Sequence, residues 1–281
     1  MCPTMMWSRR AFLTLAGVGV LAEAVVRGGA SAAEPRRLRA DDSDPLPPLE
    51  RLHLPVLRLP VVAGNGAKVP IVVEMTHPME PGHCITSVQV INERDPVPSK
   101  GVFHWGPANG RVYLAFQARM DQGFSEVTVT AECNVHGRWS STRSINVADG
   151  AGGCAAPSPP PSPAADDGIR PPALRIPQLL KGGLIRPDEV ILVQLVTRHP
   201  SRTGLAFRAG RFTQETEPFF LKEVDVIYGG ERVSRFDLTP ALSDDPFISF
   251  PLRARREGAL RVLLTNNRGQ RFEAAHEIRF A

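Results

Sequence analysis

Short runs of apolar and β-branched residues, separated by polar clusters, recur along this chain of 281 residues. In one run, Val127-Thr128-Val129-Thr130, apolar and polar positions alternate with a period of two, which is typical of a half-buried strand. Clusters of Gly, Pro, Asn and Asp separate the runs and indicate turns. No amphipathic helical pattern stands out beyond residue 32. Expected strands of this first region cover residues 54–57, 68–74, 85–90, 111–118 and 126–131.

A stretch rich in glycine and proline, residues 150–168, interrupts this pattern. Gly-rich segments are flexible and Pro-rich segments are semi-rigid, so it is expected to be a linker that permits either docking or independence of its neighbours. A second β-rich region follows, with strands expected over residues 190–196, 222–228, 247–252 and 259–265. The sequence therefore predicts an all-β protein with two β-sandwich domains, residues 49–149 and 169–281.

The two regions also repeat a short phrase. Met75-Thr76-His77-Pro78 in the first is similar to Thr197-Arg198-His199-Pro200 in the second, and a glycine stands four residues beyond each proline, at Gly82 and Gly204. Two related sandwiches would explain the repetition. For His199 a role in the turn is favoured over a role as a ligand.

The N-terminus has the features of an export signal. Ser8-Arg9-Arg10-Ala11-Phe12-Leu13 is followed by an apolar run to Val26 and by Ala30-Ser31-Ala32, a small-x-small cleavage site. This resembles a twin-arginine signal, and an ordinary secretory signal is the alternative. We expect residues 1–32 to be removed, residues 33–48 to form a tether and the mature protein to work in the periplasm. Twin-arginine export carries folded cargo, which suits a cofactor inserted beforehand.

Charge and hydropathy narrow the possible partners. The net charge of +4 falls to +2 without residues 1–32, and no block of five like charges occurs, whereas a nucleic-acid partner would require a clustered basic face. Beyond the signal no apolar stretch reaches eighteen residues, so no membrane span is expected in the mature chain.

Histidine and cysteine gather in three short phrases of the first region. They are His53-Leu54-Pro55-Val56-Leu57, His77-Pro78-Met79-Glu80-Pro81-Gly82-His83 and Cys133-Asn134-Val135-His136-Gly137-Arg138-Trp139. Together they offer four imidazoles and one thiolate. Structural zinc prefers four ligands in a tetrahedron, whereas nitrogen-rich ligation with one soft sulfur suits redox-active iron or, less well, copper.

These phrases resemble the three metal-ligand motifs of the superoxide reductase family, the ferrous domain of desulfoferrodoxin, over residues 50–147. The resemblance implies an immunoglobulin-like sandwich that holds one mononuclear non-haem iron. It also implies that His53, His77, His83 and His136 are the equatorial ligands and that Cys133 is the axial thiolate.

The segment before the first histidine departs from that family. There, Glu-Lys directly precedes the histidine and the lysine attracts superoxide, whereas this chain has Glu50-Arg51-Leu52-His53, one residue longer. The resemblance therefore makes Glu50 and Arg51 the candidate catalytic residues. Of the neighbouring residues, Cys84 is expected to be a buried non-ligand, Trp139 to pack under the sandwich and Asn134 to shape its turn.

Cys154 follows two glycines, which are expected to give its thiol reach and exposure. Gly152-Gly153-Cys154 resembles the Gly-Gly-Cys-Gly-Gly swinging arm of the SoxY sulfur carriers, although here it is internal and Ala155-Ala156 follows. The series Ile169-Arg170-Pro171, Thr197-Arg198-His199-Pro200, Tyr228-Gly229-Gly230 and Phe236-Asp237-Leu238 resembles SoxZ, the scaffold partner of SoxY. Both resemblances imply that Cys154 carries a sulfur group.

Three functions remain open at this point. The first is an exported iron protein that reduces superoxide and is attached to a SoxZ-like scaffold. The second is a SoxYZ-like carrier of thiosulfate or another sulfur oxyanion on Cys154, with the iron site structural, auxiliary or an electron outlet. The third is a periplasmic binding module with an inactive metal site. Expected partners are Sox-type cytochromes or another periplasmic electron donor.

Overall fold

The computed structural model describes residues 36–39, 47–150, 152–155 and 168–281, and these belong to one compact unit that spans residues 33–281. The predicted signal peptide, residues 33–35 and 40–46 of the predicted tether, and residues 151 and 156–167 of the predicted linker lie outside the described residues.

The first half is a sandwich of two antiparallel layers, in which buried and exposed positions alternate along the strands. One layer contains β2 (Val56–Arg58), β4 (Val69–Met75) and β7 (Val112–Ala118). The other contains β5 (Ile85–Asn92), β6 (Ser99–His104), β8 (Gly123–Cys133) and β9 (Gly137–Val147). Two short strands, β1 (Arg36–Arg39) and β3 (Val62–Ala63), pair parallel with β9.

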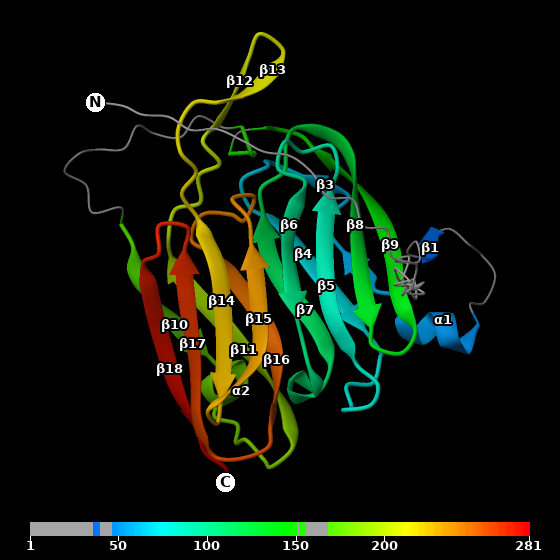
Figure 1. The fold of residues 1–281 in the computed structure, drawn as a ribbon, viewed down its shortest axis with the longest axis vertical. Coiled ribbons are helices and arrows are strands. Elements are labelled where there is room, and N and C mark those ends of the chain that lie inside the picture. The colour runs from blue at the N-terminus through cyan, green and yellow to red at the C-terminus, as the bar shows by residue number, and fades with distance from the viewer. Residues whose placement is uncertain (1–35, 40–46, 151, 156–167) are drawn as a thin grey trace, which may run out of the picture. The chain divides into compact units, whose positions relative to one another are not determined.

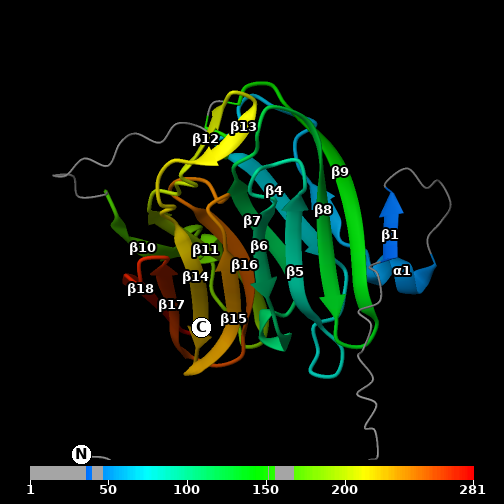
Figure 2. The same ribbon diagram turned by 45° about the horizontal axis from the view of Figure 1, so that its top comes forward.

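The second half repeats this plan. One layer contains β10 (Arg170–Arg175), β11 (Glu189–Arg198) and β16 (Phe247–Ala254). The other contains β14 (Leu221–Tyr228), β15 (Glu231–Leu238), β17 (Gly258–Asn266) and β18 (Arg271–Ile278). A separate hairpin of β12 (Leu205–Arg208) and β13 (Arg211–Gln214) stands apart from both layers (Figure 2).

Both layers run continuously from one half into the other (Figure 1). β6 pairs antiparallel with β15, and β7 pairs antiparallel with β16. The strand order is therefore β9-β8-β5-β6-β15-β14-β17-β18 in one layer and β2-β4-β7-β16-β11-β10 in the other. From the junction outward, the strands of the first half follow the orders β6-β5-β8-β9 and β7-β4-β2, and those of the second half follow β15-β14-β17-β18 and β16-β11-β10. Strands that correspond in chain order thus occupy corresponding places, which agrees with the repeated phrase in the sequence.

Aromatic side chains fill the core at this junction. Phe103 of β6 and Phe236 of β15 are opposite each other, with ring centroids 5.3 Å apart, and both are fully buried. Phe103 also packs on Phe116 at 5.1 Å, and Phe236 on Phe250 at 5.4 Å. Full burial of one such side chain stabilises the folded state by roughly 1.5–3 kcal/mol, so the junction is part of the main core.

A buried amide links the halves beside these rings. The Asn109 side chain, which is fully buried, donates to Ser234 Oγ at 2.9 Å and to the Pro251 carbonyl at 2.9 Å. Ser234 Oγ in turn donates to Asn109 Oδ1 at 3.1 Å. Because buried polar groups are costly without partners, these bonds favour one relative placement of the two halves.

The all-β class expected from the sequence is confirmed, and each expected strand coincides with a strand of the structure within a few residues. The pattern missed β6, β9, β10, β15 and β18 of the two layers, and the short strands β1, β3, β12 and β13. In the outer strand β18 only Ile278 is buried, and Ala275-His276 interrupts the alternation of apolar and polar residues. No amphipathic helical pattern was expected beyond residue 32, and the α-helices that the described residues form there, α1 (Pro48–His53) and α2 (Pro177–Leu180), are short. These helices have six and four residues, too few to produce an amphipathic period.

The predicted tether also contains regular structure, because β1 lies within it. Among the described residues, neither helix has the length and apolar character that crossing a membrane requires.

The junction predicts cooperative unfolding. Replacing Phe236→Ala leaves a cavity between the halves and is expected to destabilise the whole unit by about 3–5 kcal/mol. Urea denaturation followed by tryptophan fluorescence and circular dichroism should show one transition, shifted equally in both signals. The control Phe124→Ala, at a ring that is 61% exposed, should change stability by no more than about 0.5 kcal/mol. Two separate transitions, with only one of them shifted, would contradict this prediction.

Candidate functional site

The five candidate ligands come from three segments at one end of the first sandwich: α1, the loop between β4 and β5, and the end of β8 with the turn that follows it. His53 lies in the last turn of α1, His77 follows β4 and His83 precedes β5. Cys133 ends β8, and His136 lies in the tight turn between β8 and β9. Because β5 and β8 pair with Ile85 opposite Cys133, the second and third phrases are brought side by side.

The structure gathers these side chains into one cluster. One ligand atom from each of His53, His77, His83 and Cys133 lies within 4.8 Å of the others. His136 joins them through Nδ1, which is 3.1 Å from His83 Nε2 and 3.8 Å from Cys133 Sγ. The three phrases are therefore neighbours in space, although their outermost members, His53 and His136, are 83 residues apart in the chain.

Backbone carbonyls fix the orientation of two of the rings. His53 Nδ1–H donates to the Leu49 carbonyl at 2.7 Å, and His77 Nδ1–H donates to the Pro78 carbonyl at 2.6 Å. Since a carbonyl can only accept, each Nδ1 carries the proton and each Nε2 has a free lone pair. Both Nε2 atoms are buried and have no hydrogen-bond partner. A metal ion would satisfy them, and an imidazole held through its other nitrogen is the usual arrangement around a metal.

The surroundings also keep the donors in the protonation state that binds a metal. Burial lowers the pKa of His77 to about 4, and burial with the neighbouring His136 and His83 lowers the pKa of His53. Both imidazoles are therefore neutral at pH 7. The backbone N–H groups of Val135 and His136 donate to Cys133 Sγ, each at 3.4 Å, and so hold the sulfur in place.

Neighbouring side chains hold the turn that carries Cys133 and His136. Trp139 stacks on His53 with ring centroids 4.9 Å apart, and its Nε1–H donates to the His136 carbonyl at 3.1 Å. Asn134 Oδ1 accepts from the Cys84 N–H at 2.8 Å, as expected for a residue that shapes the turn. Cys84 is buried outside the cluster, and burial raises the pKa of its thiol.

Glu50 and Arg51 lie on α1, within one helical turn of His53. The Glu50 side chain is buried, whereas Arg51 is exposed. Arg51 therefore places a positive charge on the protein surface close to the cluster.

Cys154 does not have the exposure that the sequence suggested. It is 1% exposed, and its two glycines serve close packing. Gly152 has φ +77°, and a Cβ there would lie 2.4 Å from the Ala67 Cβ. A Cβ on Gly153 would lie 2.5 Å from Asp121 Oδ1. Glycine is therefore needed so that this segment, residues 152–155, can dock against the first sandwich, and we call it the arm.

The Cys154 thiol faces a buried ion pair that the sequence analysis did not find. Lys100 Nζ lies 3.9 Å from Cys154 Sγ and 2.5 Å from Asp95 Oδ2, and both charged side chains are almost fully buried. Burial raises the pKa of the Cys154 thiol to about 12, even though the Lys100 charge opposes the increase. The thiol is thus protonated and enclosed. These residues stand more than 50 positions before Cys154 and form no local motif with it, so only the fold reveals them.

Both halves of the molecule contact the arm. Asp121 Oδ1 accepts from the Cys154 N–H at 2.7 Å, and Arg119 Nη1 donates to the Gly152 carbonyl at 2.5 Å. From the second half, Thr203 Oγ1 donates to the Cys154 carbonyl. The arm is therefore held at the junction between the halves.

The metal-ligand cluster and the arm lie at opposite ends of the first sandwich. Cys133 ends β8, and Asp121, which binds the arm, stands two residues before β8 begins. An extended strand of 11 residues spans roughly 33 Å. Direct contact between Cys154 and an ion in the cluster is therefore excluded in this arrangement.

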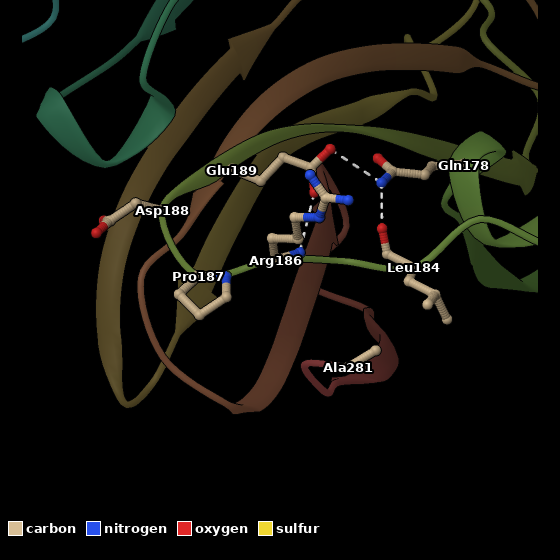
Figure 3. Close-up of a pocket in the computed structure, with 7 residues that line it drawn as sticks. All are labelled: Gln178, Leu184, Arg186, Pro187, Asp188, Glu189 and Ala281. Carbon is tan, nitrogen blue, oxygen red and sulfur yellow. Dashed lines mark hydrogen bonds between the residues drawn. The ribbon is translucent and has the colours of Figure 1, made fainter.

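The second half has no comparable set of ligands among its described residues. His199 Nδ1–H donates to the Pro200 carbonyl at 2.6 Å, as His77 does to Pro78, but its Nε2 accepts from Asn266 Nδ2 at 3.3 Å. A pocket near α2 contains neither cysteine nor histidine, and its Glu189 is bound by Gln178 and by the Arg186 N–H (Figure 3). Neither place offers the donors of the first half.

Comparison with known families assigns most of the described chain. Residues 53–154 match the model of the sulfur oxidation protein SoxY, and residues 184–277 match that of the sulphur oxidation protein SoxZ. The matches to the SoxY and SoxZ models thus follow each other along the chain, and the SoxY match ends at Cys154. A comparison with curated proteins gives no match.

Among solved structures, the chain is similar to superoxide reductases over about a third of its length. The neelaredoxin of Ignicoccus hospitalis (E23A) is 22% identical, with 34% of this chain and 82% of that chain covered and a TM-score of 0.32. The superoxide reductase of Nanoarchaeum equitans is 19% identical, with 34% and 94% covered and a TM-score of 0.30.

The lowered pKa of His77 predicts how acid affects the metal-free protein. Between pH 6.5 and 4 the unfolded chain binds a proton on this imidazole more readily than the folded chain does, so stability is lost as the pH falls. The loss from this residue is expected to reach up to about 3 kcal/mol. Urea midpoints measured from pH 7 to pH 4 should fall less steeply in His77→Gln than in the wild type. The control His276→Gln, outside the cluster, should keep the wild-type slope, and equal slopes in all three proteins would contradict the prediction.

Proposed function

We propose that this protein is a sulfur-oxidation carrier of the SoxYZ type and that Cys154 holds the sulfur group. The observation that carries the proposal is the order of the chain: a SoxY domain ends at Cys154 and a SoxZ domain follows. The scaffold supports the same conclusion, because the second half packs against the first through two continuous layers and contacts the arm directly.

The proposed reaction joins thiosulfate to the Cys154 sulfur. The thiol and thiosulfate together lose two electrons, a sulfur–sulfur bond forms between them, and the thiol proton passes to water. Two oxidised haems of Sox-type cytochromes accept one electron each. The thiolate is the reactive form of cysteine, so the arm must leave its enclosed position before the bond forms. We place this chemistry in the periplasm, on the basis of the twin-arginine pattern at residues 8–13.

For the cluster we propose one mononuclear non-haem iron, held by His53, His77, His83, His136 and Cys133. The two buried Nε2 atoms without partners support a bound metal, and four imidazoles with one thiolate suit iron. Such an ion would supply one-electron redox chemistry. Reduction of superoxide is therefore the second candidate function, in which exposed Arg51 would attract the anion and buried Glu50 would help to position α1.

The separation of the two sites determines how these functions relate. Because roughly 33 Å of β8 lies between them, an iron in the cluster does not take electrons from Cys154 by contact. The metal centre is then either structural or active toward its own substrate.

The carrier function predicts a mass adduct on one cysteine. Incubation of the protein with thiosulfate and an oxidised Sox-type cytochrome should add one thiosulfate group to the peptide that contains Cys154. Peptide mass spectrometry checks this, and reductant should remove the group. Cys154→Ser should carry no adduct, whereas Cys84→Ser should be modified as the wild type is. Absence of an adduct on Cys154 in the wild type would overturn the carrier function.

The metal proposal predicts an iron content of about one per chain after anaerobic expression. Oxidation should produce a visible thiolate-to-ferric absorption band, and Cys133→Ser should lose it because the sulfur ligand is gone. Cys84→Ser is the matched control, since Cys84 is a buried neighbour outside the cluster. A protein without iron, or a band that is unchanged in Cys133→Ser, would refute the iron centre.

A further inference from the structure

We propose that Thr203, from the SoxZ domain, holds the arm closed, so that the second half controls the reactivity of Cys154. This inference rests on the proposed carrier function and assigns to Thr203 the role of a positioning residue. Asp121 and Arg119 of the first half also bind this segment.

Three side chains bind the backbone of the arm. Asp121 accepts the Cys154 N–H, Thr203 donates to the Cys154 carbonyl, and Arg119 donates to the Gly152 carbonyl. Two of these bonds involve a charged side chain, and hydrogen bonds to charged groups are stronger than neutral ones. The bond from Thr203 is neutral and is therefore the easiest of the three to exchange.

Thr203 is itself fixed by the hairpin of β12 and β13. Its side chain is buried, and its Oγ1 accepts from the Leu205 N–H at 3.1 Å. Its carbonyl accepts from Gln214 Nε2 of β13 at 2.9 Å. The hairpin pairs with neither main layer, so a movement of the hairpin would shift Thr203 without breaking the sandwich (Figure 2).

A second connection couples the same region to the arm. Asp244 Oδ1 accepts from the Ser201 N–H at 2.6 Å, and its Oδ2 accepts from Arg119 Nη2 at 2.6 Å. Arg119 in turn binds the Gly152 carbonyl. Residues 201–203 therefore contact the arm directly through Thr203 and indirectly through Asp244.

A pocket beside the arm gives it space into which it can move. A pocket of about 380 Å³ lies between Ala155 and the hairpin, lined on the hairpin side by residues 204–208, 215 and 216. In the closed position the Cys154 Sγ faces Lys100 Nζ and the Arg119 carbonyl instead of solvent. Since the enclosed thiol cannot meet a substrate, reaction requires an open state, and Thr203 sets part of the energy difference between the two states.

Alkylation of Cys154 by iodoacetamide in the full-length protein tests this proposal. The rate at Cys154 is measured by peptide mass spectrometry at pH 8. Thr203→Val, which keeps the shape but cannot donate, should react roughly fivefold faster than the wild type, the factor expected from one neutral hydrogen bond. Thr203→Ser restores the hydroxyl and should return the rate to within twofold of the wild type.

Thr213→Val is the matched control on the same hairpin, because the Thr213 hydroxyl donates to Ala206 and not to the arm. It should react at the wild-type rate, and urea midpoints should show that all variants remain folded. Equal rates in Thr203→Val and the wild type would overturn the proposal. So would a wild-type rate equal to that of a synthetic peptide with the sequence of residues 150–158, because Cys154 would then be open.

The probe needs neither thiosulfate nor a cytochrome. A faster rate in Thr203→Val, together with no thiosulfate adduct in the wild type, would support the closed arm and reject the carrier function. An adduct on Cys154 in the wild type, together with equal alkylation rates in Thr203→Val and the wild type, would support the carrier function and reject the role of Thr203.

Discussion

The antiparallel pairing of β6 with β15, together with that of β7 with β16, is the constraint on which the rest of the structure depends. It makes two sandwiches share both layers and one aromatic core around Phe103 and Phe236. It also brings the loop that contains Thr203 against the arm of the first half. A segment that would be an exposed glycine linker in an isolated domain thereby becomes an enclosed site with partners from both halves.

The other end of the first sandwich carries a different kind of constraint. Two buried Nε2 atoms have no hydrogen-bond partner, and an unsatisfied buried polar atom costs about 1–3 kcal/mol. Folding around this cluster is therefore unfavourable locally and is stabilised by the surrounding sheets. Occupation by a metal would recover this energy, which is why the cluster fits a binding site better than a packing feature.

The two halves hold equivalent histidines in the same turn but surround them with different groups. His77 and His199 follow equivalent strands, and each donates from Nδ1 to the carbonyl of the next proline at 2.6 Å. In the second half Asn266 satisfies the remaining nitrogen, whereas in the first half that nitrogen faces the other ligands. The turn therefore holds Nδ1 in the same way in both halves. Only the groups around Nε2 make His77, and not His199, a candidate ligand.

The sequence by itself determined the all-β class, the central strands, the repeated phrase and the three groups of candidate ligands, because these follow from local periodicity and residue type. Tertiary structure alone decided that the layers are continuous, that Cys154 is buried and that Lys100 and Thr203 surround it. The outer strand β18 buries only Ile278 and interrupts the alternation of apolar and polar residues at Ala275-His276, and the neighbours of Cys154 come from segments about 50 residues away on either side. Burial and strand pairing depend on such distant contacts, so no local pattern can encode them.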